Sequence, residues 1–147
     1  MKALIIGGGD FFEISQEFFN NKYIICADRG YDYALKNNIH VDFLVGDMDS
    51  INKENKKDLN IKNIRIYPVK KDKSDMEIAI DLAIEKGYKD IEIIGAIGSR
   101  MDHSITNIFS LKKFYKNKIN IKIYNETNTI IYTEEDIEII KEKDKDY

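Results

Sequence analysis

The stretch Phe43-Leu44-Val45-Gly46-Asp47-Met48-Asp49-Ser50 indicates most about the fold. Its apolar start, residues 43–45, predicts a short buried strand that ends at a glycine followed by two acids one residue apart. In an open α/β sheet, ligands bind beside the carboxyl ends of the strands. Two carboxylates at that edge favour a divalent cation that holds phosphate groups. The alternative is a loop whose acids only cap the following turn.

Similar strands are expected on both sides of this stretch, and they alternate with helices. Apolar runs predict strands at residues 2–6, 23–27, 64–67 and 90–94. Helical spacing predicts helices at 11–19, 31–37, 74–86 and 104–115, the third with a capping box between Ser74 and Glu77. The fourth is expected to bury Ile105, Ile108, Phe109 and Leu111. This alternation predicts an α/β fold with a doubly wound, mostly parallel sheet of about five to six strands and flanking helices.

The pattern changes after residue 118. Residues 119–124, 129–133 and 137–140 are strand-like, with a turn at 125–128, and they follow one another without helices. We therefore expect residues 1–118 to form the α/β domain and residues 119–147 to supply the first strands of an incomplete, antiparallel β-rich domain.

Composition narrows the class of protein. The net charge of -3 argues against nucleic-acid binding, because a strongly basic surface is absent. No apolar run reaches membrane-spanning length, and the single cysteine, Cys26, lies in a predicted buried strand. A cytoplasmic protein without a membrane partner is expected.

Acidic residues follow four consecutive predicted strands. Asp28, the pair Asp47/Asp49, the pair Asp72/Asp75 and Asp102 all lie just beyond a strand, and Arg100 accompanies the last of them. Clustered carboxylates repel one another unless a cation lies between them, and oxygen ligands without cysteine favour Mg²⁺ over zinc. An arginine among such acids suits a polyphosphate. The pattern predicts Mg²⁺-assisted transfer of phosphoryl-type groups.

Three stretches in this order resemble the signatures of thiamine pyrophosphokinases. They are residues 46–50, residues 71–80 and residues 95–108, and Asp28-Arg29-Gly30 is similar to a fourth, glycine-rich segment of that family. Arg29 and Ser99 stand where the family more commonly has glycine. The resemblance implies an enzyme that transfers pyrophosphate from ATP to the hydroxyethyl oxygen of thiamine, which yields thiamine diphosphate and AMP.

The same resemblance implies roles for individual residues. Asp47, Asp49 and Asp75 would be the Mg²⁺ ligands, and Asp72 would organise their site. Arg100 would hold phosphate, and Asp102 would orient Arg100 or the nucleotide. ATP binding would involve Asp28, Gly30, Ser50, Lys71, Arg100, Asp102 and His103. His103 has two further interpretations, a general base and a hydrogen-bonding residue at a helix start.

The sequence leaves two alternative functions open. The acids and the ATP site do not define the acceptor, so a pyrophosphokinase for another alcohol, such as a pterin, is one of them. The other is a nucleotide- or metal-binding module without catalysis. In the family, the second domain completes the thiamine pocket, and the active site lies at a homodimer interface. The resemblance therefore implies that a chain without the rest of that domain binds nucleotide but lacks turnover.

Overall fold

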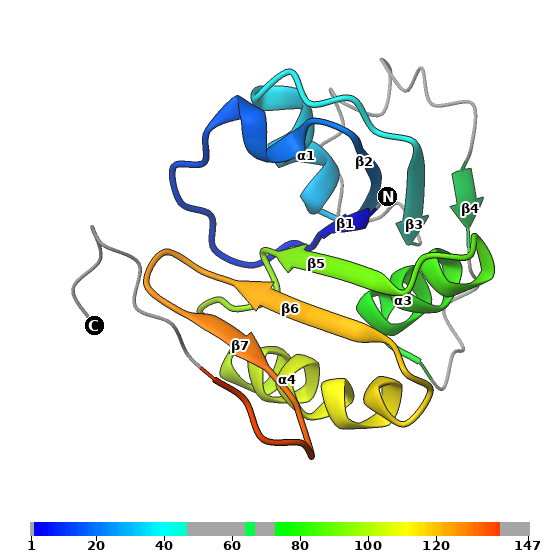
Figure 1. The fold of residues 1–147 in the computed structure, drawn as a ribbon. Coiled ribbons are helices and arrows are strands. Elements are labelled where there is room, and N and C mark those ends of the chain that lie inside the picture. The colour runs from blue at the N-terminus through cyan, green and yellow to red at the C-terminus, as the bar shows by residue number, and fades with distance from the viewer. Residues whose placement is uncertain (1, 47–63, 67–72, 139–147) are drawn as a thin grey trace.

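A computed structural model describes residues 2–46, 64–66 and 73–138, and these residues form one seven-stranded sheet flanked by helices (Figure 1). The strands are β1 (Lys2–Ile6), β2 (Lys22–Ala27), β3 (Phe43–Gly46), β4 (Ile64–Ile66), β5 (Asp90–Ile94), β6 (Asn120–Tyr124) and β7 (Thr129–Ile131). Their spatial order is β4-β3-β2-β1-β5-β6-β7. All neighbouring pairs are parallel except β6 and β7. The expected doubly wound, mostly parallel sheet is confirmed.

The strand order places a switch point between β1 and β5. From β1 the chain builds strands outward through β2, β3 and β4, and it then returns to the other side of β1 with β5. The loops that leave the carboxyl ends of β1 and β5 therefore diverge to opposite faces of the sheet. In this class of fold, such a point leaves a crevice in which ligands bind.

Alternating side chains of the central strands supply two apolar layers. Ile5, Ile25 and Ile93 face one layer, which we call the long-helix face because α3 (Asp75–Glu85) and α4 (Met101–Tyr115) cover it. Leu4, Ile24 and Ile94 face the other layer, here called the short-helix face. It is covered by α1 (Gly30–Lys36), by the 3-10 turn η1 (Gln16–Phe19) and by the chain between β1 and β2. Strands buried on both faces explain the continuous apolar runs in the sequence.

The helix α3 confirms its sequence prediction most closely. Its capping box is formed, because the Glu77 backbone N–H donates to Ser74 Oγ (3.2 Å) and the Ser74 N–H donates to Glu77 Oε2 (3.1 Å). The helix buries a broad face that includes Ile80 and Leu82. The capping box and the apolar spacing in the sequence thus predict both where α3 begins and which side of it packs on the sheet.

The helix predicted at residues 11–19 needs correction. These residues do not form a helix along their length, and only η1 is helical there. Phe11 instead stacks on Tyr33 of α1, and Phe18 packs edge-on against Phe19. The aromatic residues of this segment are spaced as in a helix, but their side chains contact different partners in the fold.

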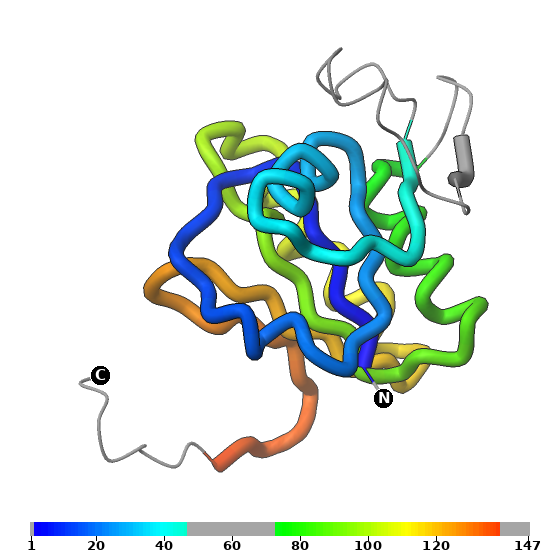
Figure 2. The backbone as a smooth tube through the Cα atoms, turned by 90° about the horizontal axis from the view of Figure 1, so that it is seen from above, coloured from blue at the N-terminus to red at the C-terminus, as the bar shows by residue number. Residues whose placement is uncertain are grey.

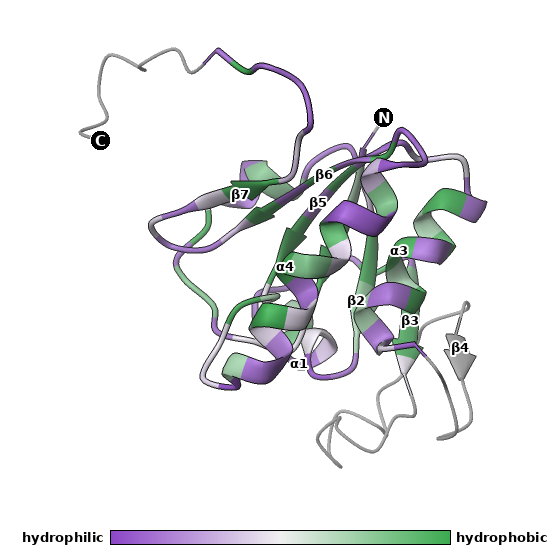
Figure 3. Cartoon of the chain, turned by 90° about the horizontal axis from the view of Figure 1, so that it is seen from below, coloured by the Kyte–Doolittle hydropathy of each residue, from purple (hydrophilic) through white to green (hydrophobic). Residues whose placement is uncertain are grey.

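The helix α4 begins at Met101, earlier than expected, and only part of its predicted face is buried. Leu111 and Phe114 lie in the core, as expected for Leu111. Ile105, Ile108 and Phe109, however, are exposed by 45%, 36% and 74% of their surfaces. The buried residues Ser104, Leu111 and Phe114 share one side of α4, which lies beside α3 on this face of the sheet (Figure 3). Phe109 precedes Leu111 by two residues, so it lies on the opposite side of the helix, toward solvent.

The C-terminal segment continues the sheet. β6 pairs in parallel with β5 over five residues, so this strand is part of the α/β sheet and does not begin a separate β unit. The predicted turn at 125–128 is confirmed as a hairpin, in which Asn125 Oδ1 accepts from the Thr127 and Asn128 N–H groups. Residues 132–138 then lead away from the sheet (Figure 2). A β-rich second domain in a longer chain remains a proposal. No helix among the described residues is long and apolar enough to cross a membrane.

Candidate functional site

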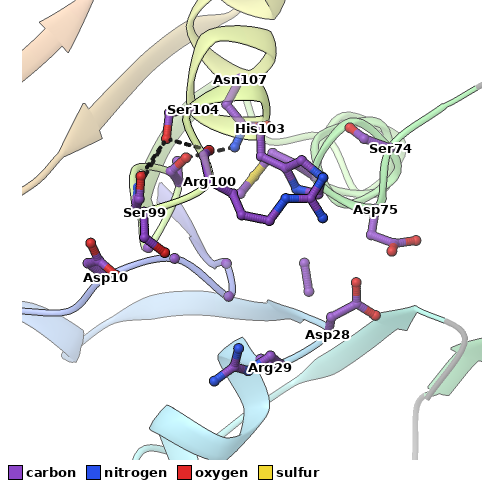
Figure 4. Close-up of a pocket in the computed structure, with 18 residues that line it drawn as sticks. Asp10, Asp28, Arg29, Ser74, Asp75, Ser99, Arg100, His103, Ser104 and Asn107 are labelled. Carbon is purple, nitrogen blue, oxygen red and sulfur yellow. Dashed lines mark hydrogen bonds between the residues drawn. The ribbon is translucent and has the colours of Figure 1, made fainter. Parts of the chain in front are cut away.

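A cavity of about 710 Å³ lies at the switch point, against the carboxyl ends of β1, β2 and β5. Its walls come from the loop after β1, the start of α1, the start of α3, and the loop between β5 and α4 (Figure 4). The volume is within the range of small-molecule sites. The sheet topology therefore gathers residues from four separate parts of the chain into one crevice.

The glycine-rich loops after β1 and β5 form the floor of this cavity. Gly9 N–H donates to the Gly95 carbonyl (2.7 Å), and Asp10 N–H donates to the Ile97 carbonyl (2.8 Å). A Cβ added at Gly9 would collide with those two carbonyl oxygens, so the approach of the loops requires glycine there. In the sequence, Gly7-Gly8-Gly9 is only a weak signal for phosphate binding, because its spacing matches neither the dinucleotide fingerprint nor the P-loop.

Asp28 enters the cavity from the end of β2 in an unusual backbone conformation. Its φ of 46° is left-handed, which Asp adopts more readily than most residues. The side chain lies against Gly46 at the end of β3, where φ is 145° and any Cβ would overlap the Asp28 carboxylate. Gly46 therefore makes room for this carboxylate next to the strand end that precedes Asp47. Such strained positions are typical of functional sites.

Asp75 reaches the same cavity from another direction. It is the first residue of α3, and the capping box of Ser74 and Glu77 fixes the point at which the helix begins. In Figure 4 the carboxylates of Asp28 and Asp75 lie on one side of the cavity, with Arg100 and His103 facing them from the α4 side. Asp28 and Asp75 therefore face Arg100 and His103 across the cavity.

Arg100 and Asp102 form a paired unit at the start of α4. Arg100 donates through Nη2 to Asp102 Oδ2 (2.6 Å) and through Nε to Asp102 Oδ1 (3.2 Å). This pairing raises the pKa of Arg100 and lowers the pKa of Asp102, chiefly through the side-chain hydrogen bond. Both side chains are largely exposed, and Arg100 lines the cavity whereas Asp102 does not. Asp102 pairs with Nε and Nη2 of Arg100, and the other N–H groups of the guanidinium can donate to an anion.

Two residues that sequence analysis assigned no role hold this loop in place. The buried Ser104 hydroxyl accepts from the Gly98 N–H (3.0 Å) and lies 3.1 Å from the Arg100 carbonyl oxygen, to which it donates. Asn107 donates through Nδ2 to the Ala96 carbonyl (2.8 Å). Their spacing of three residues, directly after a glycine-containing loop, places both on the side of α4 that faces the loop.

Comparisons with known proteins agree with this geometry. The family model described as "Thiamin pyrophosphokinase, catalytic domain" matches residues 14–123. The chain belongs to the thiamin pyrophosphokinase family. A Bacillus subtilis thiamine pyrophosphokinase is 32% identical over 126 residues, which are 84% of this chain and 59% of that protein. The chain therefore spans well under two thirds of the length of this curated relative.

Solved structures of family members share the fold. The thiamine pyrophosphokinase of Bacillus subtilis superposes with a TM-score of 0.79 at 27% identity, over 88% of this chain and 63% of that one. A probable thiamine pyrophosphokinase from Staphylococcus saprophyticus gives 0.70 at 32% identity, over 88% and 67%.

The family's expected site residues are only partly within the described structure. Asp28, Asp75, Arg100 and His103 line the cavity, whereas Gly30 does not. Gly30 instead packs against β1, where a Cβ would collide with the Ile6 carbonyl. Asp47, Asp49, Ser50, Lys71 and Asp72 lie outside the described residues. Within the described ranges, no group of three or more His, Cys, Asp or Glu side chains is arranged to hold a metal.

Proposed function

We propose that this chain carries the ATP- and Mg²⁺-binding part of a thiamine diphosphokinase. The observation that supports this most directly is the cavity at the switch point, where Arg100 and His103 face Asp28 and Asp75 in a chain of this family. The relatives' printed names supply the acceptor, thiamine, and the reaction class. The products would be thiamine diphosphate and AMP.

The carboxylates in the described part of the site suit Mg²⁺. Asp28 and Asp75 bring carboxylates into one cavity from two different elements, and hard oxygen ligands are those that Mg²⁺ prefers. Asp47, Asp49 and Asp75 are the proposed ligands, with Asp72 organising their site. When bound, the metal would neutralise phosphate charge and stabilise the leaving AMP.

This chain's own residues would position and neutralise the polyphosphate. Arg100, oriented by Asp102, would bind phosphate oxygens, and Asp28, Ser50, Lys71 and His103 would bind the nucleotide, with Gly30 placing α1 beside it. In the transfer, the thiamine hydroxyl oxygen forms a bond to the β-phosphorus. The bond from that phosphorus to the oxygen bridging to the α-phosphate breaks, AMP leaves, and the hydroxyl proton passes to solvent. Catalysis of this kind rests mainly on position and charge.

Two experiments test this proposal. Calorimetry with Mg-ATP should show binding, and Arg100→Met should weaken it by about tenfold, because a charge-assisted hydrogen bond is lost. Lys112→Met, an exposed lysine farther along α4, is the matched control and should bind as the parent does. Failure of the parent chain to bind Mg-ATP would overturn the proposal.

Chromatography of a reaction with Mg-ATP and thiamine then tests transfer. Equal amounts of AMP and thiamine diphosphate support the diphosphokinase. AMP formed only with another alcohol, such as a pterin, would indicate a different acceptor. Nucleotide binding without AMP, both in this chain and in a longer chain that carries the rest of the second domain, would favour the non-catalytic module. The homodimer and the cytoplasmic location remain predictions.

A further inference from the structure

The loop that carries Arg100 joins α4 without a side-chain cap. Arg100 is the N-cap residue of this helix, its side chain makes no capping hydrogen bond, and arginine is not among the residues favoured at that position. Asp102, in the first turn, pairs with the guanidinium at the far end of the Arg100 side chain. A different contact therefore fixes the main chain of Arg100, from which the side chain extends to the cavity at the switch point.

Ser104, one turn after Arg100, makes that contact (Figure 4). Its hydroxyl accepts from the Gly98 N–H (3.0 Å) and lies 3.1 Å from the Arg100 carbonyl oxygen, with the Gly98 carbonyl oxygen 3.2 Å away as a second acceptor. One side chain thus holds the main chain on both sides of Ser99, and we call these contacts the Ser104 bridge. Ser104 is only 2% exposed, so its hydrogen bonds form in a low-dielectric interior, where they are stronger than in water.

The loop after β1 also restricts Gly98. The Asp10 N–H donates to the Ile97 carbonyl (2.8 Å), and a Cβ added at Gly98 would lie only 3.0 Å from the Asp10 nitrogen. Gly98 is therefore packed closely against the loop after β1 while its N–H is held by Ser104. With Gly98 fixed in this way, the direction in which the Arg100 side chain leaves the main chain depends on the Ser104 bridge.

We propose that Ser104 is a positioning residue for phosphate binding, because it fixes the main chain of Arg100 so that the guanidinium meets the anion. The inference rests on the proposed function for the ligand, and it adds how Arg100 is held. Without the hydroxyl, the Gly98 N–H loses its acceptor, and the loop regains a partner for this group only by moving away from α4. That movement carries Arg100 with it, and charge-assisted hydrogen bonds weaken when their geometry is lost.

The test measures Mg-ATP affinity by calorimetry in a double-mutant cycle of Ser104→Ala and Arg100→Met. Ser104→Ala alone should bind Mg-ATP about fivefold more weakly than the parent chain. In the Arg100→Met background the same change should have almost no further effect, because the residue through which Ser104 acts is already gone. Ser110→Ala is the matched control and should bind as the parent does. It removes a hydroxyl that also donates to a main-chain carbonyl of α4 (2.7 Å), at a position that does not line the cavity.

The outcomes of the cycle separate this inference from the proposed function. An unchanged affinity in Ser104→Ala would overturn the inference while the proposed function stood. A loss of equal size in both backgrounds would overturn it as well, because Ser104 would then act on the fold or on the ligand without Arg100. A parent chain that binds no Mg-ATP would overturn both proposals.

A second measurement needs no variant. Hydrogen exchange at the Gly98 amide of the parent chain reports how often the Ser104 bridge opens. If phosphate binds only while the bridge is formed, Mg-ATP at about ten times its Kd should slow this exchange about tenfold. The Asn128 amide, which donates to Asn125 Oδ1 in the hairpin (2.7 Å), is the matched control and should exchange equally fast with and without Mg-ATP. A Gly98 amide that slows no more than the Asn128 amide would contradict the inference.

Discussion

The two faces of the sheet are covered by different means. On the long-helix face, α3 and α4 pack regular apolar stripes against the strands, and Ile80, Leu82 and Phe114 are almost completely buried. On the short-helix face, α1 has only seven residues, and an irregular, aromatic-rich segment completes the cover. The first face is built from helical periodicity, whereas the second depends on individual aromatic and charged contacts.

A nearly buried charge shows how the short-helix face differs. Glu92 of β5 accepts from Lys2 (2.7 Å) and pairs with Lys22 (2.5 Å), and its side chain is only 7% exposed. Lys22 also lies over the Phe18 ring, 3.4 Å from its centroid. The amino edge of this face is therefore closed by paired charges and an aromatic ring.

The largest effect is expected on the long-helix face. Phe114→Ala should destabilise the fold by about 3–5 kcal/mol, because it opens a cavity beneath α4 in a close-packed core. Urea unfolding followed by circular dichroism measures the change. A loss below about 1 kcal/mol would show that the end of α4 contributes little to this face.

A smaller effect, dependent on pH, is expected on the short-helix face. Glu92→Gln should cost about 2–3 kcal/mol at pH 7, because Lys22 would keep a largely buried charge without its carboxylate. Glu126→Gln, in the exposed hairpin, is the matched control and should change stability by less than about 0.5 kcal/mol.

The pH dependence of that effect has a definite sign. Burial alone would raise the pKa of Glu92, but hydrogen bonds from Lys2 and Lys22 outweigh it and lower the pKa below its usual 4.5. The stabilisation is therefore fully present above pH 4.5 and is lost as the pH falls through the folded-state pKa. The difference between parent and Glu92→Gln should shrink in acid. A difference that stays constant down to the lowest pH at which both chains fold would contradict this assignment.

The same contrast explains how far the sequence predicts the molecule. The strands and α3 follow from apolar runs and a local cap, which operate within a few residues. The false helix at 11–19 and the exposed face of α4 depend instead on which partners the sheet brings within reach. Phe11 stacks on Tyr33, while Phe109 lies on the exposed side of α4.

The candidate site, like the fold, was predicted only in part. Asp28, Asp75, Arg100 and His103 were found because charged residues after strands are visible in a sequence. The roles of Gly7–Gly9 under the cavity and of Ser104 in holding the loop before α4 were not predicted. They arise from hydrogen bonds to residues about 6 to 90 positions away along the chain.

A third effect concerns the start of α3, where the long-helix face meets the site. Ser74→Ala should cost about 1 kcal/mol, because the Glu77 N–H loses its acceptor at the N-terminus of the helix. Ser74→Thr keeps the hydroxyl and should recover most of the loss. Thermal melting resolves the two variants, and equal melting temperatures for both would show that the cap does not limit stability.

The smallest effect is expected on the exposed part of α4. Phe109→Ala makes the same chemical change as Phe114→Ala, five positions earlier on the same helix, but at a side chain that is 74% exposed. The expected change is within about 0.5 kcal/mol, and alanine's higher helix propensity offsets part of any lost contact. The ratio of the two effects thus measures burial with residue type and helix held constant. A loss above about 1 kcal/mol that grows with protein concentration would mean that a second copy of the chain covers this part of α4 in solution. The contrast between the two phenylalanines would then reflect assembly as well as burial within one chain.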